Sequence, residues 1–185
     1  MKLATTFAGL TLAIASAYSA PAVSQTVYGA PSAPTARCQA SVAMSELAIR
    51  KRPLAMQNNS ETDGAWVTCA FPFTVSFNAS GEVAESPVLV DAYFWNYSTT
   101  EKTVTCSGVT GWEGGENEYV GLSVDIPANS GGIEDANEDG MDDGNLFWYD
   151  TDFEGGGMST GLVMINCYLP PGTGVNDTYV YWGTV

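Results

Sequence analysis

The most chemically specific segment of the sequence is an acidic loop that begins at residue 135. Counted from the first residue of this loop, oxygen-bearing side chains fall at positions one, three, five and nine, and a glycine stands at position six; these residues are Asp135, Asn137, Asp139, Asp143 and Gly140. Ca²⁺ binds hard oxygen ligands, and a loop that reverses at a glycine can wrap alternate side chains around one ion. The spacing therefore predicts a calcium site, and calcium is the one cofactor that we expect.

The same loop resembles the D-x-N-x-D-G-x-x-D loops of EF-hand-like and thrombospondin type-3-like calcium repeats. The resemblance implies that four residues of the loop bind the ion through their side chains, namely Asp135, Asn137, Asp139 and Asp143. It also implies that Met141 binds through its backbone carbonyl. Position twelve is Leu146, where an EF-hand has a bidentate glutamate. Asp150, Asp152 or Glu154 could complete the ligand shell. The alternative interpretation is a solvated acidic loop that is rich in turn-forming residues.

A second pattern that suggests binding is an aromatic stripe. Tyr93, Trp95 and Tyr97 alternate with apolar residues that include Phe94, so the three rings are expected on one face of a strand. Tyr179 and Tyr181 could extend the stripe. Flat aromatic surfaces pack against sugars and against proline-rich peptides, so the stripe predicts a carbohydrate-binding surface. The alternative is that these rings are buried inside the fold or beneath a loop.

Two further patterns point toward hydrolysis, but the rest of the chain does not support either. Residues 157–161 match the GxSxG motif around Ser159, whose serine needs a histidine base, and the chain contains no histidine. A glycosidase needs only two carboxylates, and acidic residues are abundant in this chain. Their abundance alone does not indicate which two would lie at the separation that the reaction requires. We therefore expect a non-catalytic protein, and a small secreted glycoside hydrolase is the alternative from a different class.

The charge balance narrows the choice of partners. The chain has 21 acidic and 6 basic residues, a formal net charge of −15, and Lys102 is its last basic residue. Such a surface repels phosphate backbones and anionic lipid head groups, so nucleic acid is not an expected partner. A glycan or another extracellular protein is expected instead.

The first residues predict export. Lys2 precedes an uncharged apolar run, and small-x-small sequences end at Ala17 and at Ala22. Residues 1–22 therefore have the pattern of a signal peptide, whose cleavage is expected after either alanine and whose apolar part is too short to span a membrane. We expect a secreted or periplasmic protein without membrane insertion once the leader is removed. Residues 23–37 contain proline, glycine and serine without an apolar period, which predicts a flexible linker before a domain at 38–185.

The four cysteines are Cys38, Cys69, Cys106 and Cys167. An even number in an exported chain favours disulfides, and we expect Cys38–Cys69 and Cys106–Cys167, one of three possible pairings. The last three of these cysteines share strand faces with apolar residues, which predicts bridges inside a sheet assembly.

Alternating apolar residues predict the fold class. Such alternation is seen at 67–77, 88–97, 103–107, 120–126, 161–169 and 179–182, and glycine-, asparagine- or proline-rich turns separate these segments. Weaker strand patterns occupy 54–57 and 146–149, and 41–49 is the one helix-like stretch. The sequence thus predicts an all-β fold, an antiparallel sandwich of about seven to eight strands.

Three short motifs carry a resemblance to known proteins. They are Val67-Thr68-Cys69, Val104-Thr105-Cys106 and Cys167-Tyr168-Leu169-Pro170-Pro171-Gly172. These motifs resemble a group of uncharacterised secreted bacterial proteins, which are small β-domains with a leader peptide and cysteines at strand ends. The resemblance implies export and a β-sandwich, and it supplies no functional residue.

Overall fold

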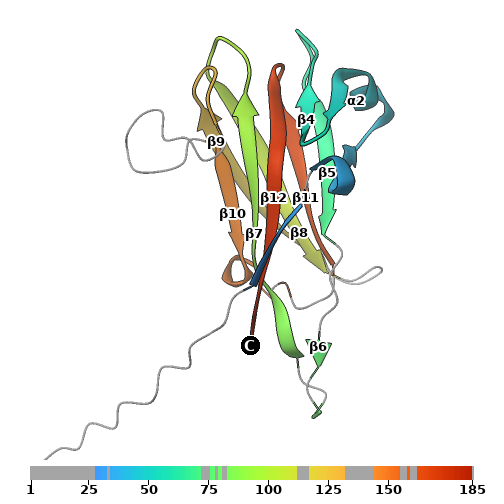
Figure 1. The fold of residues 1–185 in the computed structure, drawn as a ribbon, viewed down its shortest axis with the longest axis vertical. Helices are drawn as coiled ribbons and strands as arrows, with labels where there is room; N and C mark the ends of the chain where they lie inside the picture. The colour runs from blue at the N-terminus through green and yellow to red at the C-terminus, as the bar shows by residue number, and fades with distance from the viewer. Residues whose placement is uncertain are drawn as a thin grey trace, which may run out of the picture.

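The computed structural model describes residues 28–32, 34–71, 76–77, 79–80, 83–111, 117–131, 144–154, 158 and 162–184. These residues form two antiparallel β-sheets that pack face to face, as Figure 1 shows. The predicted all-β sandwich is confirmed.

Sheet A has the strand order β10 (Asn145–Tyr149), β7 (Val83–Asn96), β12 (Thr173–Thr184), β4 (Ala55–Asn58) and β3 (Ile49–Arg52), with β1 (Tyr28–Ser32) paired to β12 and β6 (Ser76–Phe77) paired to β7. Sheet B has the order β2 (Cys38–Ala40), β5 (Ala65–Phe71), β11 (Leu162–Leu169), β8 (Lys102–Gly111) and β9 (Asn117–Ile126). The remaining elements are the short helices α1 (Pro34–Arg37) and α2 (Ala43–Ala48) and the 3₁₀ turn η1 (Asp150–Asp152).

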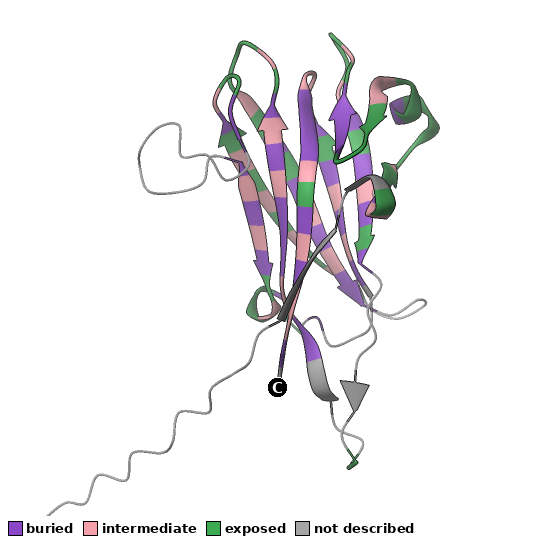
Figure 2. Ribbon diagram, viewed as in Figure 1, coloured by how far each residue is buried: buried purple, intermediate pink, exposed green. Residues whose placement is uncertain are grey.

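The core lies between the two sheets and follows from the alternation of the sequence. Along β5, every second residue from Ala65 to Phe71 is buried, and the same holds for Val90, Ala92 and Phe94 on β7. Because successive side chains of a strand point to opposite faces, these residues turn toward the other sheet. Figure 2 shows the resulting bands of buried and less buried residues along the strands.

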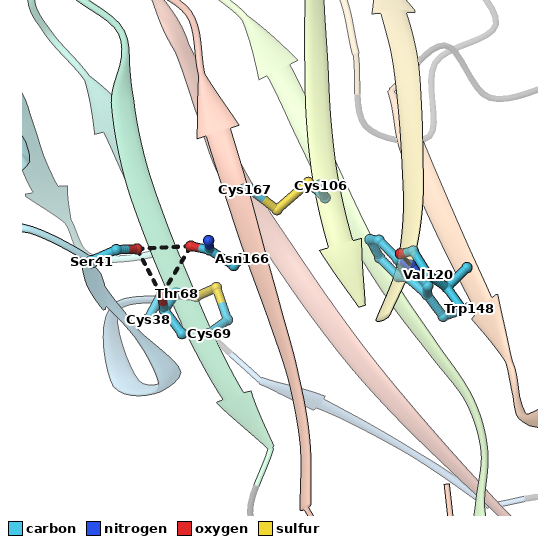
Figure 3. Close-up of a disulfide and its surroundings, with 9 residues drawn as sticks. All are labelled: Cys38, Ser41, Thr68, Cys69, Cys106, Val120, Trp148, Asn166 and Cys167. Carbon is cyan, nitrogen blue, oxygen red and sulfur yellow. Dashed lines mark hydrogen bonds between the residues drawn. A yellow bond between two sulfur atoms is a disulfide. The ribbon is translucent and has the colours of Figure 1, made fainter. Parts of the chain in front are cut away.

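Both disulfides lie within sheet B, and the predicted pairing is confirmed. Cys38 bonds to Cys69 between β2 and β5, and Cys106 bonds to Cys167 between β8 and β11 (Figure 3). In each bond the two cysteines are directly opposite each other in the strand register. All four cysteines belong to the buried core, so the bonds join neighbouring strands of one sheet beneath the facing sheet.

Trp148 of β10 links the two sheets. Its ring is fully buried, and its Nε1 donates a hydrogen bond of 3.0 Å to the backbone oxygen of Val120 on β9 (Figure 3). The indole occupies the space above Gly108 of β8, where an added Cβ would lie 2.4 Å from Trp148 Cδ1. Gly108 is therefore a packing requirement for this tryptophan.

We expect Gly108→Ala to destabilise the protein by about 2–3 kcal/mol, because the methyl group forces the Trp148 indole out of its position in a close-packed core. The measurement is guanidinium unfolding followed by tryptophan fluorescence. Gly121→Ala is the matched control, because Gly121 lies on the neighbouring strand β9 and an added Cβ there meets nothing within 4 Å. The control should change stability by less than about 0.5 kcal/mol. Equal effects of the two substitutions would contradict this account of the core.

Two buried asparagines close the ends of strands. The side-chain nitrogen of Asn58 donates to the backbone oxygens of Asp63 and Leu169, and that of Asn96 donates to the backbone oxygens of Thr100, Ile126 and Pro127. Each asparagine oxygen also accepts a hydrogen bond from the backbone N–H two residues later. Both asparagines begin an N-x-Ser sequence of the kind that accepts glycans, but both are fully buried. Their side chains hold the backbone at the ends of strands.

The structure differs from the sequence-based expectations in two respects. It has twelve strands among the described residues, more than the seven to eight expected. The additional strands were not predicted because segments of two to five residues, such as β6 and β1, are too short to show alternation. Residues 28–32 and 34–37, which the composition placed in a linker at 23–37, form β1 and α1. The helical stretch at 41–49 is confirmed as α2, yet Met44 and Leu47 on it are exposed and Ser45 is buried. Within the described part of the chain, no helix is long and apolar enough to cross a membrane.

Candidate functional site

The outer surface of sheet A gathers aromatic side chains from two adjacent strands. Trp95 and Tyr93 on β7 point away from the core, because their neighbours Phe94 and Ala92 are buried between the sheets. On β12, Tyr179 and Tyr181 are registered opposite Asp91 and Leu89 of β7 and therefore share this outer surface. We call the set Tyr93, Trp95, Tyr97, Tyr179 and Tyr181 the aromatic face.

The rings of the aromatic face contact one another along the strands. Tyr93 and Tyr179 meet edge to face with ring centroids 5.5 Å apart, and Tyr179 stacks on Tyr181 at 6.2 Å. Trp95 and Tyr97 lie 6.1 Å apart. Four of the rings are half-buried and Tyr97 is 38% exposed, so the structure brings together the predicted residues without covering them.

A β-bulge shapes one end of the aromatic face. The register between β7 and β12 shifts between Val175 and Asp177, which leaves Asn176 as the extra residue. The Tyr97 hydroxyl donates a 2.9 Å hydrogen bond to Asn176 Oδ1, which fixes the phenol beside the bulge. Gly174 lies opposite Trp95, and a Cβ on it would lie 3.3 Å from the Tyr97 ring. Bulges commonly re-aim side chains at functional sites, and this one orients Asn176 and Asp177 on the outer surface.

Asp91 is the unexpected member of this surface. It belongs to the outward-facing row of β7, yet it is 1% exposed, and its Oδ1 atom has no hydrogen-bond partner. Its strand-register neighbours are Phe147 on β10 and Tyr179 on β12. A carboxyl group is thus buried among rings on the outside of a sheet.

The electrostatics of Asp91 follow from this burial. Desolvation raises the pKa of the Asp91 carboxyl to about 7, and the negative charge of Asp177 acts in the same direction. Hydrogen bonds from the Tyr93 side chain and from the Tyr179 backbone lower the pKa but do not offset the burial. Burial also raises the pKa of Asp177. Burial and the charges of Asp177 and Asp91 raise the pKa of Tyr179, and burial, the charge of Asp91 and the neighbouring Tyr179 raise the pKa of Tyr181. The phenols therefore keep their protons and act as hydrogen-bond donors at neutral pH.

Sequence reasoning identified the rings of this surface but missed both carboxylates. These carboxylates are Asp91, between Leu89 and Tyr93 on the outward face of β7, and Asp177, before Tyr179 on β12. The available signal was an acidic residue between Leu89 and Tyr93 on the same face of a strand, since a charge rarely stands in an apolar row without a partner.

The predicted calcium ligands Asp135, Asn137, Asp139, Met141 and Asp143 lie outside the described residues. Of the acids considered for completing the shell, Asp150 accepts the backbone N–H of Met158 and Asp152 accepts that of Tyr149. Across the described ranges, no group of three or more metal-ligating histidine, cysteine or acidic residues is suited to hold an ion. Calcium binding by this loop stays a prediction.

An acidic hollow lies between β9 and η1 and includes Asp152 and Glu154. It has a volume of about 570 Å³ and is lined by Asn117, Glu118, Tyr119, Val120, Asp152, Phe153 and Glu154. Glu118 Oε2 is buried there without a hydrogen-bond partner, whereas Asp152 is engaged in the local turn. The hollow is a weaker candidate than the aromatic face, because Glu118 as a whole is only partly buried.

Hydroxyl-bearing side chains form one further cluster among the described residues. Ser159 of the GxSxG sequence lies outside the described residues. On the outer surface of sheet B, Ser41 and Thr68 both donate to Asn166 Oδ1, at 2.9 and 3.1 Å, and their hydroxyl oxygens are 2.7 Å apart (Figure 3). This cluster joins the chain after β2 to β5 and β11 and contains no general base.

Fold and site together define a disulfide-stabilised β-sandwich whose outer sheet surface presents aromatic rings around a buried carboxyl group. No protein-family model and no curated protein sequence matches the chain.

Proposed function

We propose that the protein is an exported, non-catalytic binding domain that holds a carbohydrate against the aromatic face. The observation that supports this most directly is the row of partly exposed rings on β7 and β12, which continues to Tyr97 directly after β7. Apolar faces of sugar rings pack on aromatic side chains, and sugar hydroxyls need hydrogen-bond partners. Asn176, Asp177 and the tyrosine hydroxyls place such partners beside the rings.

The shape of this surface favours an extended ligand. The outward row of β7 runs from Leu89 to Trp95, which corresponds to roughly 20 Å at the usual rise of a strand. The rings follow the strand direction, so a chain of sugar units could contact several of them in succession. Pairs of rings that interact with each other lose little freedom on binding, which favours affinity.

Export is supported by two independent features. Both disulfides indicate folding in an oxidising environment. The first 22 residues have the composition of a leader peptide.

The aromatic face is tested by Trp95→Ala and Tyr179→Ala. Each should weaken binding of a soluble polysaccharide by roughly 5- to 150-fold, because one stacking ring contributes about 1–3 kcal/mol by analogy with base stacking on aromatic side chains. The measurement is affinity electrophoresis over a panel of neutral and amino polysaccharides, followed by calorimetric titration. Trp66→Ala is the matched control, since Trp66 is 41% exposed beside Tyr168 on the outer surface of sheet B.

Binding that survives both substitutions on the aromatic face, or that Trp66→Ala abolishes equally, would refute this assignment. Turnover of the polysaccharide by purified protein would overturn the non-catalytic part of the proposal. That result would favour the hydrolase alternative, in which Asp91, with its raised pKa, stands near Asp177 as an acid beside a carboxylate. We rank it second because a fully buried Asp91 cannot reach a glycosidic oxygen.

We further propose that calcium stabilises the loop from Asp135 to Asp143. Calcium at millimolar concentration should then raise the midpoint of a thermal melt, because a ligand that binds only the folded state stabilises it. A chelator should reverse the shift, and Asp139→Asn should abolish it. An unchanged midpoint would remove calcium from the description of this protein.

A further inference from the structure

Four side chains of the outer surface of sheet A alternate between acid and phenol. Asp91 and Tyr93 lie two residues apart on β7, and Asp177 and Tyr179 lie two residues apart on β12. The register pairs Asp91 with Tyr179 and Tyr93 with Asp177, so the two carboxylates occupy one diagonal and the two phenols the other. We call these four residues the acid–phenol square.

The acid–phenol square concentrates negative potential. The charge of Asp177 raises the pKa of Asp91, so the two carboxylates sense each other. The faces of the Tyr93 and Tyr179 rings, which meet edge to face at 5.5 Å, add the negative side of their quadrupoles. The chain as a whole carries a net charge of −15. An anionic ligand is therefore disfavoured here, and a cationic one is favoured.

Asp91 provides the observation that points to a ligand. Its carboxyl is 1% exposed and its Oδ1 lacks any hydrogen-bond partner, which is costly for a buried polar atom. The carboxyl accepts hydrogen bonds from the Tyr93 side chain and the Tyr179 backbone, but its Oδ1 atom is left without a donor. A positive charge held above Tyr93 and Tyr179 would stabilise the ionised Asp91 carboxyl through space, without direct contact with the buried oxygen.

We propose that the acid–phenol square binds the protonated amino group of an amino sugar within the carbohydrate ligand. The ammonium contacts the exposed Asp177 carboxylate and the tyrosine rings, while Asp91 supplies the second negative charge from beneath. A cation within about 6 Å of a tyrosine ring is attracted to its face, and an ammonium has three donors for the surrounding oxygens. The flanking rings Trp95 and Tyr181 pack against neighbouring sugar units. This inference rests on the proposed carbohydrate function and adds the ligand's charge.

The test is calorimetric titration with glucosamine oligosaccharides and with their fully N-acetylated counterparts of the same length. It is performed at a pH at which the free amino groups carry their protons. The glucosamine oligomer should bind roughly tenfold more tightly, because a charge-assisted contact replaces a neutral one. Asp177→Asn should remove this preference, so that both oligomers bind the variant with equal affinity. Asp125→Asn, at an exposed aspartate of β9 in sheet B, is the matched control for loss of one negative charge.

A second measurement isolates Asp91. A cation bound beside its carboxyl favours the ionised form, so binding should release protons, which titrations in buffers of different ionisation enthalpy detect. Asp91→Asn should abolish that release.

The outcomes separate the two proposals. Equal binding of both oligomers would overturn the amino-sugar inference and leave the carbohydrate function standing, whereas binding of neither would overturn both. A lysine oligomer of equal charge that bound as tightly as the glucosamine oligomer would overturn the assignment to a sugar.

Discussion

Replacement of Cys106 and Cys167 together by alanine is expected to lower the free energy of unfolding by about 4 kcal/mol. The bond joins residues separated by 61 positions, and cross-linking so long a segment restricts the unfolded chain strongly in the chain-entropy model. Single domains are stable by only about 5–15 kcal/mol, so the variant would retain a small margin. Loss of this one bond should therefore be the most damaging change in sheet B.

The second disulfide provides the matched comparison. Cys38 and Cys69 are separated by 31 residues, so their replacement should cost roughly 0.6 kcal/mol less than that of the first pair. Both are measured by guanidinium unfolding of the double-alanine variants. All four cysteines are at most 5% exposed, so native protein should also resist reduction until it unfolds, which thiol labelling with increasing denaturant detects. A Cys106–Cys167 variant as stable as the wild type, or bonds reduced readily without denaturant, would contradict this assignment.

The disulfides were predictable because their information is local. Cys69, Cys106 and Cys167 share strand faces with Val67, Val104 and Ile165, and period-two alternation fixes the face of a residue without knowledge of the partner strand. The sequence could not decide whether the bonds cross between the sheets or join strands within one. That choice depends on the strand order β2-β5-β11-β8, which the pairing of distant segments sets.

Strand β1 shows the opposite case, in which local composition misleads. Gly29 and Pro31 are poor strand formers, and they made residues 23–37 resemble a linker. In the structure, β1 pairs with β12 in the register Pro31 to Tyr179, and it lies at a sheet edge, where proline is tolerated. The strand exists because β12 extends beyond β4 and offers backbone groups for pairing, which no pattern within residues 28–32 reveals.

The candidate site likewise has one part that the sequence predicts and one part that it does not. Tyr93, Trp95 and Tyr97 were predictable as one face, because they alternate along a single strand. The burial of Asp91 was not, because Phe147 and Tyr179 flank it from strands that are 56 and 88 residues away in the sequence. A side chain that a single strand would leave in solvent is thus buried by its neighbours in the sheet.

This burial makes Asp91 a determinant of how stability depends on pH. The pKa of its carboxyl is about 7 in the folded protein and 3.8 in the unfolded reference, so the folded state holds the proton more tightly. Its contribution to stability is complete below about pH 4 and is lost as the pH rises through 7. The two pKa values correspond to a loss of about 4 kcal/mol over this range. The titratable groups around it are Tyr93 on β7, Asp177, Tyr179 and Tyr181 on β12, and Tyr149 on β10 next to Leu89.

Asp91→Asn should remove this dependence, because the amide has the shape of the protonated acid and does not ionise. The difference in unfolding free energy between variant and wild type should shift in favour of the variant by about 4 kcal/mol from pH 4 to pH 8. Chemical unfolding at intervals of half a pH unit measures the shift, and any constant cost of burying the amide cancels in the comparison. Asp125→Asn removes an equal formal charge from an exposed position on β9 and is the control for the loss of one negative charge. Parallel profiles for Asp91→Asn and the wild type would instead show that the Asp91 carboxyl is hydrated in solution, and the ligand site built around it would lose its basis.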